Sequence, residues 1–217
     1  VGVSSRTSQI NGIAIGANSE TTQVNGIAIG ANTVSSAINS IVMGANANST
    51  AQNAIAIGHA SNATQTNSIA VGGLSSAPRA NAIAIGQASL ANESNSVSIG
   101  QASNANSTNA IALGHGTLAN QSNSIAIGAA ANAANVRSIA IGAGALADFD
   151  NSVAIGVGAD TTAVDQIRLG RATNPPVVSV PGNLIVDGNF DVVGTTTFKN
   201  TSSLTVGDIN VMIGTVS

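Results

Sequence analysis

Residues 53–58 read Asn-Ala-Ile-Ala-Ile-Gly and residues 123–128 read Asn-Ser-Ile-Ala-Ile-Gly, and close variants of this phrase return along most of the chain. The final glycine of the phrase recurs every fourteen residues without insertion or deletion. A unit this short cannot bury a core alone and gains stability only by stacking on copies of itself, so each unit is predicted to be one coil of a solenoid, and the chain to be a rod. The repeat glycines are Gly2, Gly16, Gly30, Gly44, Gly58, Gly72, Gly86, Gly100, Gly114, Gly128, Gly142, Gly156 and Gly170.

Each unit is expected to hold two short strands and two turns. Before the glycine, bulky and small residues alternate with a period of two, which is typical of a strand. Ile83 and Ile85 then point to one face and Ala84 to the other. The second half of the unit, as in residues 87–91, is rich in Ala and Ser and suits a second strand.

The geometry of such coils predicts a thin all-β roll, on the order of 60 Å long for roughly twelve coils spaced about 4.7 Å apart. Two arrangements stay open. Either the Ala face fills the interior and the Ile columns lie outside, or the Ile fill the interior and an Ala-flat sheet is exposed. In both cases an apolar or flat surface runs along the rod and needs a partner, and a second copy of the same chain is the simplest one.

Composition supports thin layers of small side chains. The chain is 43% hydrophobic, yet only 1% aromatic and 7% charged, with no Cys. The basic residues are scattered and the net charge is −3, so no nucleic-acid partner is expected. No apolar run is long enough to cross a bilayer and no signal peptide is recognisable, so no membrane insertion is expected. Because the chain begins at Val1 without Met, we expect a fragment of a longer protein.

The residue five places before the repeat glycine is nearly always Asn, with Arg137 and Asp165 as exceptions. Asn accepts left-handed backbone angles, and stacked Asn side chains can hydrogen-bond to the coils above and below. The glycine is expected to serve the opposite turn, where a positive φ or a close backbone approach excludes a Cβ. Both positions are interpreted as structural.

The phrase Asn-Ser-Ile-Ala-Ile-Gly, followed by an Ala- and Ser-rich half in every unit, resembles the head repeat of trimeric autotransporter adhesins, the YadA-like head. The likeness covers Val1 to about Arg171. It implies a left-handed parallel β-roll that forms a homotrimeric fibre around the rod axis. This handedness is opposite to the right-handed crossovers that parallel strands normally have.

Beyond residue 171 the pattern ends. Residues 172–182 contain Pro175-Pro176 and are expected to be a linker. In residues 183–217 apolar residues alternate, and Gly182, Gly188 and Gly194 are spaced six apart, which predicts a short-strand β-fibrous shaft segment. This segment resembles the shafts of bacteriophage tail fibres.

Catalysis and metal binding have little support, so no enzyme activity, cofactor or metal is expected. His59 and His115 occupy the same slot, one place after a repeat glycine, and lie four coils apart, about 19 Å along the rod, which is too far to share a metal. Four acids near the end of the roll match no compact Ca²⁺ loop and are interpreted as solvated turn residues. These are Asp148, Asp150, Asp160 and Asp165.

Two functional hypotheses and a control remain. The first is a section of a phage tail fibre or other virion appendage that presents receptor-binding elements, together with other fibre or virion proteins, to a host-surface glycan or protein. The second is the head of a bacterial surface adhesin that binds host matrix or cells. The control is a spacer without a ligand. The candidate binding residues are variable turn positions. They are His59, Arg79, Gln87, Gln101 and His115.

Overall fold

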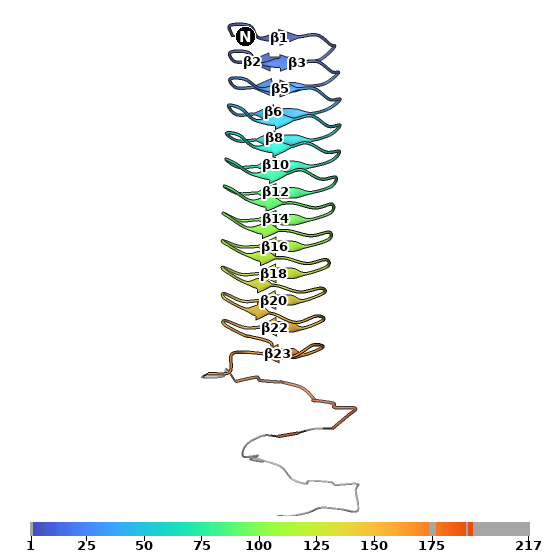
Figure 1. The fold of residues 1–217 in the computed structure, drawn as a ribbon, viewed down its shortest axis with the longest axis vertical. Coiled ribbons are helices and arrows are strands. Elements are labelled where there is room, and N and C mark those ends of the chain that lie inside the picture. The colour runs from blue at the N-terminus through green and yellow to red at the C-terminus, as the bar shows by residue number, and fades with distance from the viewer. Residues whose placement is uncertain (1, 174–176, 190, 193–217) are drawn as a thin grey trace, which may run out of the picture. The chain divides into compact units, whose positions relative to one another are not determined.

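The structure is a computed structural model, and it describes residues 2–173, 177–189 and 191–192. The chain divides into one unit of residues Val1–Val178 and a second of residues Ser179–Ser217. Every regular element of the described residues is a β-strand, and all of the strands belong to the first unit. The expected all-β parallel solenoid is thus confirmed, and Figure 1 shows its coils stacked on one axis from β1 to β23.

The strands form two parallel sheets, and each coil contributes one strand to each sheet, except the last coil, which contributes only β23. Strands of three residues end just before the repeat glycine. They are β2 (Ile13–Ile15), β4 (Ile27–Ile29), β6 (Ile41–Met43), β8 (Ile55–Ile57), β10 (Ile69–Val71), β12 (Ile83–Ile85), β14 (Val97–Ile99), β16 (Ile111–Leu113), β18 (Ile125–Ile127), β20 (Ile139–Ile141), β22 (Val153–Ile155) and β23 (Ile167–Leu169). We call their sheet the long-strand sheet.

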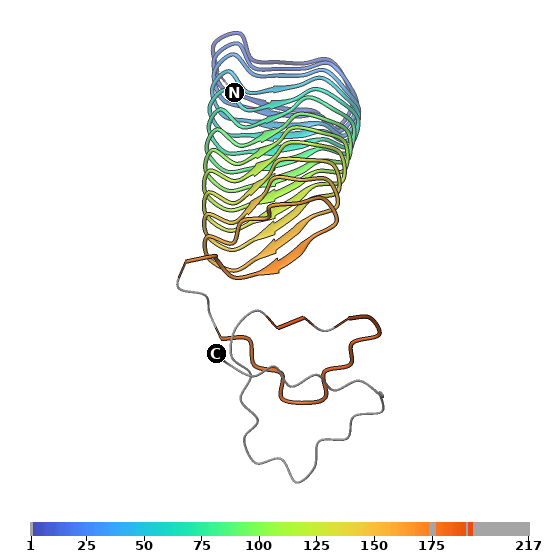
Figure 2. The ribbon, with the colours of Figure 1, turned by 60° about the horizontal axis from the view of Figure 1, so that its bottom comes forward.

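Strands of two residues form the second sheet, which we call the short-strand sheet. They are β1 (Arg6–Thr7), β3 (Glu20–Thr21), β5 (Val34–Ser35), β7 (Asn48–Ser49), β9 (Asn62–Ala63), β11 (Ser76–Ala77), β13 (Leu90–Ala91), β15 (Asn104–Ala105), β17 (Leu118–Ala119), β19 (Asn132–Ala133) and β21 (Leu146–Ala147). In both sheets the register is one full unit, as in the pairing of Ile69 with Ile83. Figure 2 shows the resulting superposition of the turns along the edges of the roll.

The interior is built from small side chains, which decides between the two arrangements left open by the sequence. The central residue of a long strand, such as Ala84, is buried, whereas Ile85 is 37% exposed. Ala, Ser and Thr from the short strands and the turns fill the rest of the core. Val42 is the largest fully buried side chain. The two sheets therefore lie too close together to admit Ile, and the Ile columns face outward.

The Asn turn behaves as its sequence predicted. Asn53, Asn67 and Asn81 all have φ between 58° and 59°. The side-chain amide of Asn53 donates to the side-chain oxygen of Asn67 over 3.2 Å, and Asn67 donates to Asn81 over 3.2 Å. Arg137 and Asp165 keep the same left-handed backbone, with φ of 56° and 58°. Backbone conformation is thus conserved at these exceptions, and only the side-chain bonding differs.

The repeat glycine is required on both predicted grounds. Gly58 has φ +130°, and a Cβ placed on it would lie 2.5 Å from the backbone carbon and oxygen of Gly72 in the next coil. No real Cβ makes such a contact, so the glycine column is the place where neighbouring coils approach most closely.

A second left-handed position, two residues after the repeat glycine, was not anticipated from the sequence. It is occupied by Ser or Asn in the early coils and by Ala, Leu or Gly further along, as at Ala60 with φ 53° and Leu74 with φ 60°. Ala and Leu adopt this conformation at a cost of about 1 kcal/mol each. The coil geometry therefore overrides local preference at these turns.

The roll ends at β23, two residues before the expected boundary at 171. The part of the predicted linker that lies at 174–176, Phe190 and all of 193–217 fall outside the described residues. The described part of the predicted shaft, 183–189 and 191–192, contains no strand, and the shaft stays a prediction. Within the described residues, no helix is long and apolar enough to cross a membrane.

Candidate functional site

An apolar stripe runs along the outer face of the long-strand sheet. It consists of the first and last residues of each three-residue strand, from Ile13 and Ile15 to Ile167 and Leu169, and we call it the Ile stripe. In the middle of the roll, Ile85, Ile127 and Ile141 are 36–37% exposed although strands flank them on both sides. The Ile stripe is therefore continuous over all twelve strands of its sheet.

The size of the Ile stripe indicates a contact surface. It is about eleven coil spacings long and three residues wide, roughly 500 Å² in projection. Monomeric proteins rarely leave apolar patches above about 300–600 Å² exposed, and such patches commonly mark interaction sites. Because the strands pair in register, the stripe repeats at every coil, so it suits a partner that is equally long and regular.

The outer face of the short-strand sheet is polar and internally bonded. The amide of Asn92 donates to the side-chain oxygens of Asn104 over 3.1 Å and Asn106 over 2.8 Å. Asn106 in turn donates to Asn120 over 2.9 Å. Leu90 alternates with Asn104 along this face, so it offers isolated apolar residues between ordered amides. The two faces of the roll thus differ sharply in chemistry.

Four of the five candidate binding residues lie in one turn column and are exposed. They are His59, Gln87, Gln101 and His115, each one residue after a repeat glycine. Of these, the structure brings Gln101 and Gln87 together, with a hydrogen bond of 3.2 Å between their side chains. His59 and His115 stay separated by three intervening coils, as expected.

Arg79, the fifth candidate, lies at the other turn of its coil. Its Nε is 3.6 Å from a carboxylate oxygen of Glu93, and the two side chains are 52% and 41% exposed. An ion pair this accessible contributes little to stability, about 1 kcal/mol or less. Arg79 is therefore available to a ligand only in competition with Glu93.

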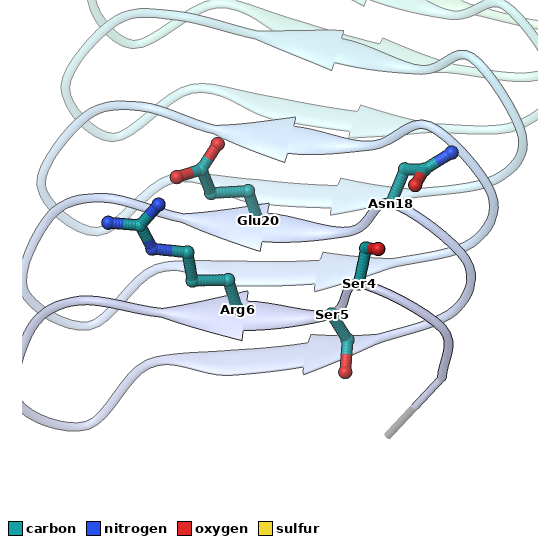
Figure 3. Close-up of a pocket in the computed structure, with 5 residues that line it drawn as sticks. All are labelled: Ser4, Ser5, Arg6, Asn18 and Glu20. Carbon is teal, nitrogen blue, oxygen red and sulfur yellow. The ribbon is translucent and has the colours of Figure 1, made fainter.

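A hollow near the start of the roll was not singled out from the sequence. It has a volume of about 430 Å³ and is lined by Ser4, Ser5, Arg6, Asn18 and Glu20. Figure 3 shows Arg6 and Glu20 side by side, and their strands β1 and β3 pair in register at these two residues. The lining offers charged and hydroxyl groups for a polar ligand, but it has no His or Cys that could activate a nucleophile.

The acids near the end of the roll serve the turns. Asp150 accepts a hydrogen bond from the backbone N–H of Val136 over 3.1 Å, and Asp165 accepts one from the side-chain amide of Asn151 over 2.7 Å. In the described residues, no group of three or more His, Cys, Asp or Glu is placed to hold a metal ion. The turn interpretation of Asp150 and Asp165 is thereby supported by specific bonds.

Comparison with known proteins finds a matching family model and similar solved structures. The model of the YadA head domain repeat (2 copies) matches residues 1–19, 22–47, 48–75, 80–103, 91–117, 105–131 and 133–159. The structure is similar to that of the collagen-binding domain of the Yersinia adhesin YadA, with 19% sequence identity and a TM-score of 0.43 over 83% of this chain and 92% of that chain. No curated protein matches the chain.

Proposed function

This chain belongs to the YadA head domain repeat family, and we propose that it is a stiff segment of a homotrimeric adhesive fibre. Its role is mechanical: the stacked coils hold binding elements at a distance from the surface that carries the fibre. No chemical reaction is assigned to it.

The Ile stripe is the observation that carries this proposal. Its side chains are half-exposed in one chain and follow one another from strand to strand along the long-strand sheet. Identical stripes can cover one another when copies lie side by side around a shared axis, which is cyclic symmetry and closes the assembly. Three is the copy number that the resemblance to the adhesin heads implies.

Stiffness follows from the way each coil is held. Backbone hydrogen bonds link every coil to the next through both sheets, and the Asn side chains add a parallel line of bonds outside them. Because nearly all contacts are between neighbouring coils, a load on one end is transmitted coil by coil. A trimer has three such rolls side by side, which stiffens the fibre, and it removes the Ile stripe of each chain from water.

The surface left for a host receptor in such a trimer is the polar face and the turns. His59, Gln87, Gln101 and His115 lie on one turn column, and Arg79 on the other. These residues remain our candidates for contact with a host-surface glycan or protein. The hollow lined by Arg6 and Glu20 is a further candidate for a small polar group.

Two carriers are proposed, each on its own observation. A phage tail fibre or similar virion appendage is favoured by residues 182–198, whose spaced glycines and alternating apolar residues resemble tail-fibre shafts. A bacterial surface adhesin is favoured by the head repeats themselves. Immunogold labelling with an antibody against the roll separates them, since gold on virions supports the first and gold on bacterial cells the second.

The decisive experiment for the fibre is the molar mass of the purified chain by light scattering coupled to size exclusion. A particle of three chains with an elongated shape is expected. A monomer at all accessible concentrations would refute the trimeric fibre, because the Ile stripe would then be stable in water without a partner.

A further inference from the structure

The last coil, Val157–Gly170, departs from the repeat at the positions that face the interior. Gln166 occupies a slot that holds only Gly, Ala or Ser in the other coils, and Arg168 one that holds Ala, Ser or Val. These changes fall where the stack ends, so each can be compared with the same position inside the roll.

The hydroxyl of Thr161 replaces a backbone carbonyl at the edge of the short-strand sheet. In earlier coils, the N–H that follows the short strand donates to the next coil's backbone, as Ala134 does to the oxygen of Ala147 over 3.0 Å. In the last step, the N–H of Asp148 donates to Oγ1 of Thr161 over 3.1 Å. Thr161 is 2% exposed, so this substitute bond is shielded from water.

In the last coil, the side chain of Gln166 likewise replaces a backbone acceptor. The N–H of Thr162 is equivalent to that of Thr22, which donates to the oxygen of Ser35 in the next coil over 3.1 Å. No such strand follows Thr162 in the described residues, and its N–H donates instead to Oε1 of Gln166 over 2.7 Å. The side chain of Gln166 thus accepts the hydrogen bond that this N–H would otherwise donate to an added strand.

Arg168 covers the end of the core. It pairs in register with Ala154, so its side chain leaves the sheet on the interior face. Ala154 and Ala159 are fully buried, although only one coil follows Ala154. At the opposite end, the interior Ala14 of the first coil is 9% exposed. A long cationic side chain can cover apolar groups with its stem while its head stays in water.

From these contacts we infer that the coil Val157–Gly170 is a cap that ends the stack and prevents a second copy from adding its strands end to end. An open parallel edge is a template for further strands. Here, two donors on the short-strand side of the edge, the N–H groups of Asp148 and Thr162, are already used by Thr161 and Gln166, and an added coil would bury the charge of Arg168 without a partner. This goes beyond the proposed fibre, because it concerns association along the axis and not across the Ile stripe.

The test is the full chain with the repeat restored in the cap, as Thr161→Ala, Gln166→Ser and Arg168→Ala combined. Each replacement is a residue found at that slot elsewhere in the roll, so folding is preserved. The matched control is Arg137→Asn, which also removes one Arg and restores the repeat, but on an internal turn. The base particle, whether trimer or monomer, is first defined by light scattering on the unchanged chain.

We expect the restored variant to form particles of two or more times the base mass and rod length as its concentration rises, because head-to-tail addition leaves a new open end, whereas the control keeps the base mass. Hydrogen exchange gives the second readout. Thr161→Ala is expected to speed exchange at the Asp148 amide about tenfold, and Thr161→Ser to leave it slow.

Two results would overturn the cap. If the Asp148 amide exchanges equally in the Ala and Ser variants, the hydroxyl does not seal the edge. If exchange rises as expected but the restored variant keeps the base mass, the edge is sealed but does not control association. If the unchanged chain is a monomer and not a trimer, only the base mass differs. The change of mass in the restored variant and the exchange of the Asp148 amide can still be measured.

Discussion

Asn67 donates its side-chain amide to the side-chain oxygen of Asn81 over 3.2 Å, one coil further along the roll. The same bond joins Asn53 to Asn67, so Asn67 is a donor in one direction and an acceptor in the other. The line of bonds is therefore directional. Arg137 can only donate, and it bonds to Asn151 through Nε, whereas Asp165 only accepts and ends the line.

Asn67→Ala is expected to lower the stability of the roll by about 1–3 kcal/mol, because it removes two side-chain hydrogen bonds and places Ala at a positive φ. Asn67→Gly is the matched variant, since it keeps the backbone freedom and loses only the bonds. Thermal unfolding followed by circular dichroism measures both. Equal stability of Asn67→Gly and the unchanged chain would mean that the exposed amide bonds contribute nothing.

Gly86→Ala is expected to destabilise the roll by more than about 3 kcal/mol or to prevent folding, because steric strain of this kind cannot relax in a packed stack. Its Cβ would lie 2.5 Å from the backbone oxygen of Gly100. Gly116→Ala is the control, because its Cβ meets nothing within 4 Å and Ala already occupies that slot in other coils. Denaturant unfolding of the two variants should differ clearly, and similar midpoints would contradict the close approach of the coils.

Ile83→Asp with Ile85→Asp is expected to abolish the trimer altogether, because the charges lie in the middle of a continuous Ile stripe. Leu118→Asp is the control on the polar face of the roll. Light scattering should give monomers for the first variant and the unchanged mass for the second. A trimer that survives the Ile83 and Ile85 changes would place the interface elsewhere.

Asn11 is expected to deamidate several times faster than Asn25, although both precede glycine. The reaction requires the glycine nitrogen to attack the Asn side-chain carbon with loss of ammonia. The Gly26 N–H donates to the oxygen of Gln23 and Gly26 is buried, whereas in the described residues the Gly12 N–H has no such bond and Gly12 is half-buried. Peptide mapping by mass spectrometry after incubation at mildly alkaline pH measures both sites in one sample. Equal rates would show that these differences at the turn do not control the reaction.

Much of the fold could be predicted from periodicity alone. The constant spacing of the glycines indicates coils, and the alternation around residues such as Ile83 and Ala84 indicates strands. Alternation does not say which face is inside, because both faces are uniform along the rod. The thickness of the interior decides it, and the interior is thin because its buried residues are small, such as Ala47 and Ala56 in one core cluster.

The second left-handed turn and the hollow at Arg6 were harder to find from the sequence. Ala60 and Leu74 carry no local signal for a positive φ. The signal was in the same slot of other coils, where Asn18 and Gly116 stand, and it appears only when the units are compared by position. The hollow depends on the side chains of Arg6 and Glu20, which lie one repeat apart and pair in register, so it appears only when these two units are compared side by side.

The contact between successive glycine backbones, described for Gly58 and Gly72, has an evolutionary consequence. An insertion or deletion that shifts the glycine turn by anything other than a whole repeat would move a side chain into that column and break the stack. Loss or gain of a complete unit keeps every contact and changes the rod by about 4.7 Å. The reach of the rod can therefore change in single steps of one repeat, without a new surface having to evolve.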